Sequence, residues 1–138
     1  MRFSTDIWQG FLREVFPALP AGPRKKLFLD VSDCSIREPE EIRTMLAVMG
    51  QLAAYTAISL SVNANEFRTL SNVLIPEASS QREQAEELLR FCGLEHLFIH
   101  VRDGAYCVDA ADRRLETRKD RPFTRQQLAV LFSALLMD

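Results

Sequence analysis

The sequence is poor in cysteine, lacks a long apolar run and carries little net charge. Its three cysteines, Cys34, Cys92 and Cys107, form no C-x-x-C pair. This argues against a disulfide framework or a zinc site and indicates reduced thiols in a cytoplasmic protein. No apolar run approaches the roughly 20 residues that cross a bilayer, and the N-terminus lacks the features of a signal peptide. The net charge of −2 gives no reason to expect nucleic acid or a membrane as a partner.

Apolar residues make up 47% of the chain, enough for the core of one domain over residues 1–138. Short apolar runs predict strands over 27–31, 56–62, 97–101 and 105–109. Helical periodicity predicts helices over 7–15, 39–54, 64–74 and 81–92, and a last helix bearing Leu128, Leu131, Phe132 and Leu135. Thr5 or Asp6 should cap the first helix and Pro17 should end it. The charged stretch 113–121 is expected to be a surface loop.

Local signals support several of these boundaries. Pro39 suits a first helical turn. Ser80 and Glu83 form an S-x-x-E capping box, and Gly93 is a natural C-terminal stop. Asp103-Gly104 predicts a hairpin turn between the last two strands.

Strands that alternate with helices predict an α/β fold with a mainly parallel sheet and one β-hairpin. Ligands of such sheets bind beyond the carboxyl ends of the strands. The positions of interest are therefore residues 30–35, 63–66 and 102–104.

The stretch SVNANEF places Asn63 and Glu66 where the second strand turns into a helix. N-x-x-E is itself a capping box, in which Asn63 would accept the first amides of the helix and Glu66 would bond back to the N-cap. The same pair could instead serve a phosphate and metal site. Both interpretations remain open from the residues alone, and one turn could do both.

Four stretches resemble the C-terminal portion of the ribokinase, or PfkB, family of carbohydrate kinases: TDIWQGFLREVFPALP, KKLFLDVSDCSIREPEEIRTMLAVMG, SLSVNANEF and AEELLRFCGLEHLFIHVRDGAY. The resemblance covers roughly residues 4–110 and is sharpest at SVNANEF, which is similar to the family's N-x-x-E motif after a strand. It implies a partial ribokinase-like fold, a three-layer α/β/α arrangement, and transfer of a phosphoryl group from ATP to a sugar hydroxyl.

The resemblance also implies roles for individual residues. Glu66 would hold Mg²⁺ through water molecules, and Asn63 would bond a phosphate oxygen or a metal-bound water. Arg102 and Gly104 would contact the nucleotide. Mg²⁺ keeps several waters and is often positioned by one or two carboxylates together with substrate phosphates, and phosphoryl transfer depends on positioning and charge neutralisation.

Three departures from the family pattern bear on activity. The chain begins where a typical member is near its middle, and the hairpin reads HVRDGAY in place of T-x-G-x-x-G. The region of the family's G-A-G-D turn reads PFTRQQLAV, without glycine or aspartate, so no catalytic residue is assigned. We therefore expect a fragment or degenerate copy of a sugar kinase that is inactive as this chain alone.

A second interpretation is a non-catalytic regulatory or interaction domain of STAS-like type. LFLDVSDCS followed by an amphipathic helix suits it, with Ser35 near the position of a phosphorylatable serine. The N-x-x-E turn and the helix before the first strand favour the kinase resemblance.

Other polar residues have simpler interpretations. Asp30 and Asp33 end a strand and are better explained as loop or helix caps than as a metal pocket. His96 and His100 should share one face of a strand, but no third zinc ligand accompanies them. Nothing nearby would activate Cys34 as a nucleophile.

Loss of the front half of a parallel sheet would expose strand edges and apolar surface. We therefore expect a homo-oligomer or a partner chain that covers an exposed sheet edge.

Overall fold

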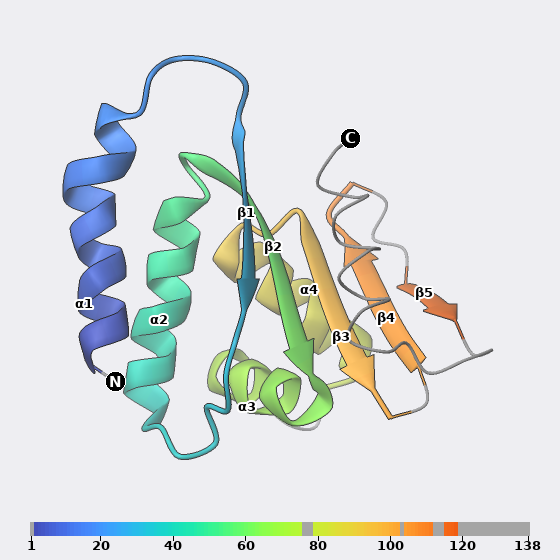
Figure 1. The fold of residues 1–138 in the computed structure, drawn as a ribbon. Coiled ribbons are helices and arrows are strands. Elements are labelled where there is room, and N and C mark those ends of the chain that lie inside the picture. Colours follow the sequence, from blue (N-terminus) through green and yellow to red (C-terminus); the bar gives the residue numbers. More distant parts are fainter. Residues whose placement is uncertain (1, 76–78, 103, 112–114, 119–138) are drawn as a thin grey trace.

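The computed structural model describes residues 2–75, 79–102, 104–111 and 115–118. Five strands form one sheet in chain order: β1 (Lys25–Asp30), β2 (Thr56–Asn63), β3 (His96–Val101), β4 (Gly104–Asp109) and β5 (Leu115–Arg118). β1, β2 and β3 are parallel, whereas β4 and β5 continue the sheet in antiparallel pairing (Figure 1). The sheet is therefore mixed.

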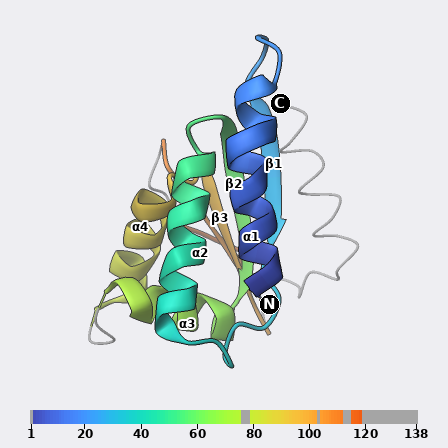
Figure 2. The ribbon, with the colours of Figure 1, turned by 90° about the vertical axis from the view of Figure 1, so that its left-hand side faces the viewer.

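The helices are α1 (Arg2–Gly10), α2 (Pro39–Leu52), α3 (Ala64–Leu74) and α4 (Gln81–Cys92). A π-helical turn, η1 (Phe11–Val15), and a 3₁₀ turn, η2 (Phe16–Ala18), prolong α1. Figure 2 shows α2, α3 and α4 on the same side of the sheet. The predicted α/β class is confirmed. The second helical layer of a three-layer fold is not among the elements that the structure describes.

One continuous core fills the space between β1–β4 and the helices. Ile58, Leu60 and Val62 of the central strand are fully buried there, against side chains such as Leu46 of α2 and Leu88 of α4. Parallel strands need this cover because their crossover helices return over the sheet. Both crossovers run in the same direction across the sheet, so right-handed connections place their helices on the same side.

α1 lies alongside β1, at the edge of the sheet (Figures 1 and 2). It packs on α2, and Trp8 of α1, Leu12 of η1 and Phe16 of η2 pack against the core. An exposed edge of the sheet was expected to need cover. At the β1 edge, the chain's own N-terminal segment lies alongside the strand. No helix in the described ranges has both the length and the apolar character of a membrane span.

Most predicted elements are confirmed, including α3 at the predicted residues. Two expectations are wrong. α1 begins at Arg2, ahead of the predicted caps, although the helix stops by Pro17 as predicted, since η1 ends at Val15 and only the short 3₁₀ turn η2 contains Pro17. The charged stretch 113–121 contains β5, which pairs with β4. The predicted last helix lies outside the described residues.

The two ends of α4 follow the sequence signals. Ser80 accepts a hydrogen bond from the backbone of Glu83, and the Glu83 carboxylate accepts one from the backbone of Ser80. The hydrogen bonds that the carboxylate accepts from the backbone N–H and the hydroxyl of Ser80 lower the pKa of Glu83. Gly93 ends the helix in the left-handed region at φ 60°.

Replacement of Gly93 by alanine should destabilise the fold. A left-handed alanine costs about 1–2 kcal/mol, and its Cβ would lie 2.8 Å from the Cβ of Ala53. Urea unfolding should show this loss. Gly22→Ala is the control, because its Cβ would meet nothing within 4 Å. Equal stability of the two variants would contradict the role of Gly93.

Candidate functional site

The carboxyl ends of β1, β2 and β3 meet at one edge of the sheet, as predicted. Asn63 ends β2, while Arg102 and Gly104 belong to the hairpin that joins β3 to β4. Asn63 pairs with His100, and His100 pairs with Ala105. Because two strand spacings separate Asn63 from Ala105, their backbones lie about 10 Å apart. The four residues assigned from the resemblance share this edge, with β3 between the two pairs.

Asn63 and Glu66 form a closed capping box at the start of α3. Asn63 Oδ1 accepts hydrogen bonds from the backbone N–H groups of Asn65 and Glu66, each at 2.9 Å. Glu66 Oε2 accepts one from the backbone N–H of Asn63 at 2.8 Å. The turn therefore supplies partners to amides that would otherwise be orphaned at a helix start.

Glu66 is a buried carboxylate, with 8% of its surface exposed. It lies near the thiol of Cys34, which is fully buried. Burial raises the pKa of Cys34, and the negative charge of Glu66 raises it further. The carboxylate therefore faces the interior beside a neutral thiol, an environment unlike the hydrated surroundings that Mg²⁺ keeps in proteins.

Of the two acidic residues at the end of β1, Asp33 has a capping role in the structure. Asp33 Oδ1 accepts a hydrogen bond from the backbone N–H of Ser35 at 2.9 Å, so it caps a turn. The bonds from Ser35 lower the pKa of Asp33. Asp30 is exposed at the strand end. Within the described ranges, no group of three or more His, Cys, Asp or Glu side chains is placed to hold a metal ion.

A polar array on the sheet face opposite the helices was missed from the sequence. Ser59 Oγ lies 3.2 Å from His96 Nδ1, and His96 Nε2 lies 3.2 Å from Asp109 Oδ2. His96 also stacks on Phe98, with ring centroids 6.0 Å apart. The sequence signal was the shared strand face of His96 and His100, which the register confirms. The partners of His96, which are Ser59 and Asp109, lie on the two neighbouring strands and belong to no sequence motif.

The array contains the side chains of a hydrolytic triad, but its setting favours a structural role. A nucleophilic serine must reach its substrate, with hydrogen-bond donors aimed at the developing oxyanion. Ser59 is buried, in the middle of the central strand. The three side chains instead link β2, β3 and β4 across the sheet, as cross-strand polar pairs do.

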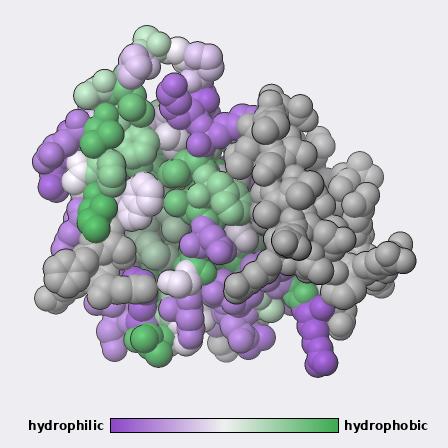
Figure 3. Space-filling view, in the orientation of Figure 1, coloured by the Kyte–Doolittle hydropathy of each residue, from purple (hydrophilic) through white to green (hydrophobic). Residues whose placement is uncertain are grey.

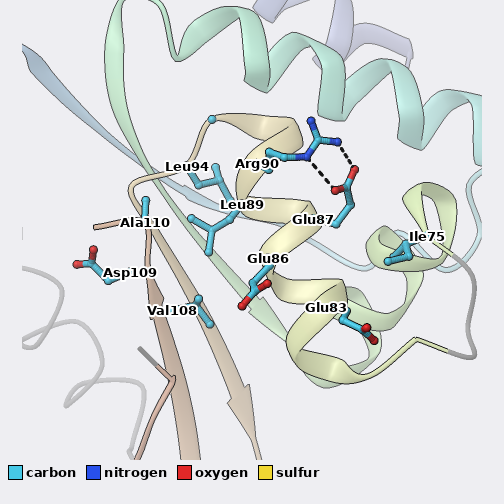
Figure 4. A pocket seen from close by; sticks show the side chains of 11 residues that line it. Ile75, Glu83, Glu86, Glu87, Leu89, Arg90, Leu94, Val108, Asp109 and Ala110 are labelled. Atoms are coloured by element: carbon cyan, nitrogen blue, oxygen red, sulfur yellow. Dashed lines mark hydrogen bonds and ion pairs between the residues drawn. The ribbon is translucent and has the colours of Figure 1, made fainter. Parts of the chain in front are cut away.

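A cavity of about 520 Å³ lies against α4 and the end of β4 (Figure 4). Its apolar floor includes Leu89, Leu94 and Val108, and Glu87 at its rim is paired with Arg90. The hydrogen bond from Arg90 lowers the pKa of Glu87. None of the residues predicted for the nucleotide or the metal lines this cavity.

Comparisons of the chain with protein-family models, with curated proteins and with solved structures found no match.

Asn63→Ala should lower the free energy of unfolding by about 1 kcal/mol, because the N-cap oxygen that serves two backbone amides is lost. Chemical denaturation measures this change. Asn65→Ala is the matched control, two residues away, since no hydrogen bond of its side chain is found in the described structure. Indistinguishable effects of the two substitutions would contradict the capping role.

The thiols should react in a fixed order with an aromatic disulfide reagent. Cys34 and Cys92 are fully buried, and burial raises the pKa of Cys92 to about 12. Because the thiolate is the reactive form, both should react only on unfolding, whereas the half-buried Cys107 should react first in the native protein. Cys107→Ser should remove the fast phase, and a fast phase that persists in this variant would refute the order.

Proposed function

We propose that this chain is a non-catalytic relative of the C-terminal portion of PfkB-type sugar kinases and serves as a binding or interaction domain. The order of parallel strands, crossover helices and closing hairpin is compatible with the resemblance seen in the sequence. The missing G-A-G-D turn and the lack of an assignable catalytic base support an inactive copy.

The observation that carries this proposal is the use made of Asn63 and Glu66. In the described geometry Asn63 Oδ1 accepts hydrogen bonds from the backbone N–H groups of Asn65 and Glu66, and Glu66 Oε2 accepts one from the backbone N–H of Asn63. A phosphate-binding asparagine and a Mg²⁺-positioning glutamate would instead present their oxygens to ligand or water. In this arrangement Asn63 Oδ1 and Glu66 Oε2 serve the backbone of the turn, which favours the cap over a Mg²⁺–ATP site.

The STAS-like alternative has less support from the structure. A phosphorylatable serine of that type would stand where a helix opens. Ser35 lies in the turn capped by Asp33, and α2 begins only at Pro39, with Glu38 as N-cap. The kinase-derived framework therefore remains the better basis for a proposal.

The melting temperature should not respond to Mg²⁺–ATP. A nucleotide present at about 100 times its Kd would add about 2.7 kcal/mol to the stability of a binding-competent protein, which is a shift of several degrees. A non-catalytic copy with a closed cap should show no shift beyond that of Mg²⁺ or of ATP alone.

Glu66→Gln separates the two roles of the turn. Glutamine serves in a capping box as glutamate does, so this variant should keep nearly all of the stability. It would remove the negative charge that a Mg²⁺ site needs. A saturable Mg²⁺–ATP shift in the wild type that disappears in Glu66→Gln would overturn the proposal.

A further inference from the structure

The N-terminal segment carries an apolar stripe that the core does not use. Ile7, Phe11, Val15 and Leu19 recur every four residues and are 57%, 40%, 41% and 38% exposed. A second stripe packs on the core. It consists of the residues that directly follow Ile7, Phe11 and Val15, namely Trp8, Leu12 and Phe16. Figure 3 shows apolar side chains gathered along α1 on the face toward the viewer.

The π turn keeps the exposed stripe straight. In an α-helix of 3.6 residues per turn, every fourth residue drifts steadily around the axis. Between Phe11 and Val15 the chain is π-helical, and the Phe16 N–H bonds to the Phe11 carbonyl, five residues back. This wider turn takes more than four residues per revolution and reverses the drift. Val15 therefore returns to the line of Ile7 and Phe11.

Aromatic contacts connect the exposed stripe with Tyr55, which enlarges the exposed apolar surface. The ring centroid of Phe11 lies 5.7 Å from that of Trp8 and 6.4 Å from that of Phe16, and Phe16 lies 6.0 Å from Tyr55. Tyr55 is itself 42% exposed. Large side chains have areas of about 150–250 Å², so the stripe and Tyr55 expose roughly 400 Å² per chain. Patches of that size on a soluble protein are commonly interaction sites.

We propose that this surface, formed by α1, η1 and Tyr55, pairs with the same surface of a second copy across a two-fold axis. A single straight stripe is self-complementary when two copies lie antiparallel, which is the isologous arrangement of most homodimers. Two copies would bury roughly 800 Å² of apolar surface. With a polar rim, this reaches the about 1,200–2,000 Å² of a stable interface.

The charges near the two ends of the segment suit the same occupant. Asp6 is exposed near the start of α1, and Lys25 and Lys26 are exposed after its C-terminal end. Antiparallel pairing brings Asp6 of one copy toward Lys25 and Lys26 of the other, and it also opposes the two helix dipoles. This dimer does not depend on nucleotide binding, so the dimer test and the Mg²⁺–ATP test fail independently.

Sedimentation equilibrium of the full chain tests the dimer. The wild type should shift from monomer to dimer over roughly a hundredfold range of concentration. Phe11→Glu should weaken the dimer by about tenfold or more, because it places a charge at the centre of the apolar interface. Ile36→Glu is the matched control: Ile36 is 90% exposed, lies outside the stripe, and should leave the dimer unchanged.

Trp8, the one tryptophan of the chain, provides a second readout beside Phe11. Its emission should change with concentration in the wild type and in Ile36→Glu, but not in Phe11→Glu. Circular dichroism and urea midpoints check that Phe11→Glu remains folded. A wild type that stays monomeric, which would leave the surface to a different partner, or a Phe11→Glu dimer as strong as the wild type would overturn the proposal.

Discussion

Cover for the central strand is the constraint on which the rest of the structure depends. β2 is flanked by parallel neighbours on both sides, and its helix-facing side chains, Ile58, Leu60 and Val62, are fully buried. The chain must therefore leave the end of β2 and turn at once into a helix that lies over the sheet. The first backbone N–H groups of a helix have no partner within the helix, and at a helix start so close to the core water cannot reach all of them. Asn63 and Glu66 supply hydrogen-bond partners at this helix start. The cap is therefore required by the position of β2 in the middle of the sheet.

Much of this fold could be predicted from the sequence because local signals agreed with the hydrophobic pattern. The S-x-x-E box and Gly93 mark both ends of α4, and N-x-x-E marks the start of α3. β5 was missed because charge in a short stretch is typical of a loop, whereas an edge strand tolerates charged side chains well. The start of α1 was placed too late because Thr5 and Asp6 are good capping residues that the structure places within the helix.

The position of the candidate residues could be predicted from the sequence, but the hydrogen bonds that their side chains make could not. That Asn63, Arg102 and Gly104 share one edge follows from the direction of parallel strands. Whether the oxygens of Asn63 and Glu66 face a ligand or the backbone depends on side-chain geometry that a four-residue pattern does not specify. The Ser59–His96–Asp109 array was beyond sequence reasoning, since its members meet only through strand register. The exposed stripe could not be predicted either, because its residues line up only through a π turn that the sequence pattern does not indicate.

A double-mutant cycle on Asn63 and Glu66, measured by urea unfolding with and without Mg²⁺–ATP, tests the central claim most directly. Alanine at either position breaks the same reciprocal cap. The two effects should therefore be non-additive, with a coupling of about 1 kcal/mol that is the same in both conditions. Additive effects would contradict a reciprocal cap, and a coupling that appears only with Mg²⁺–ATP would indicate a working nucleotide site.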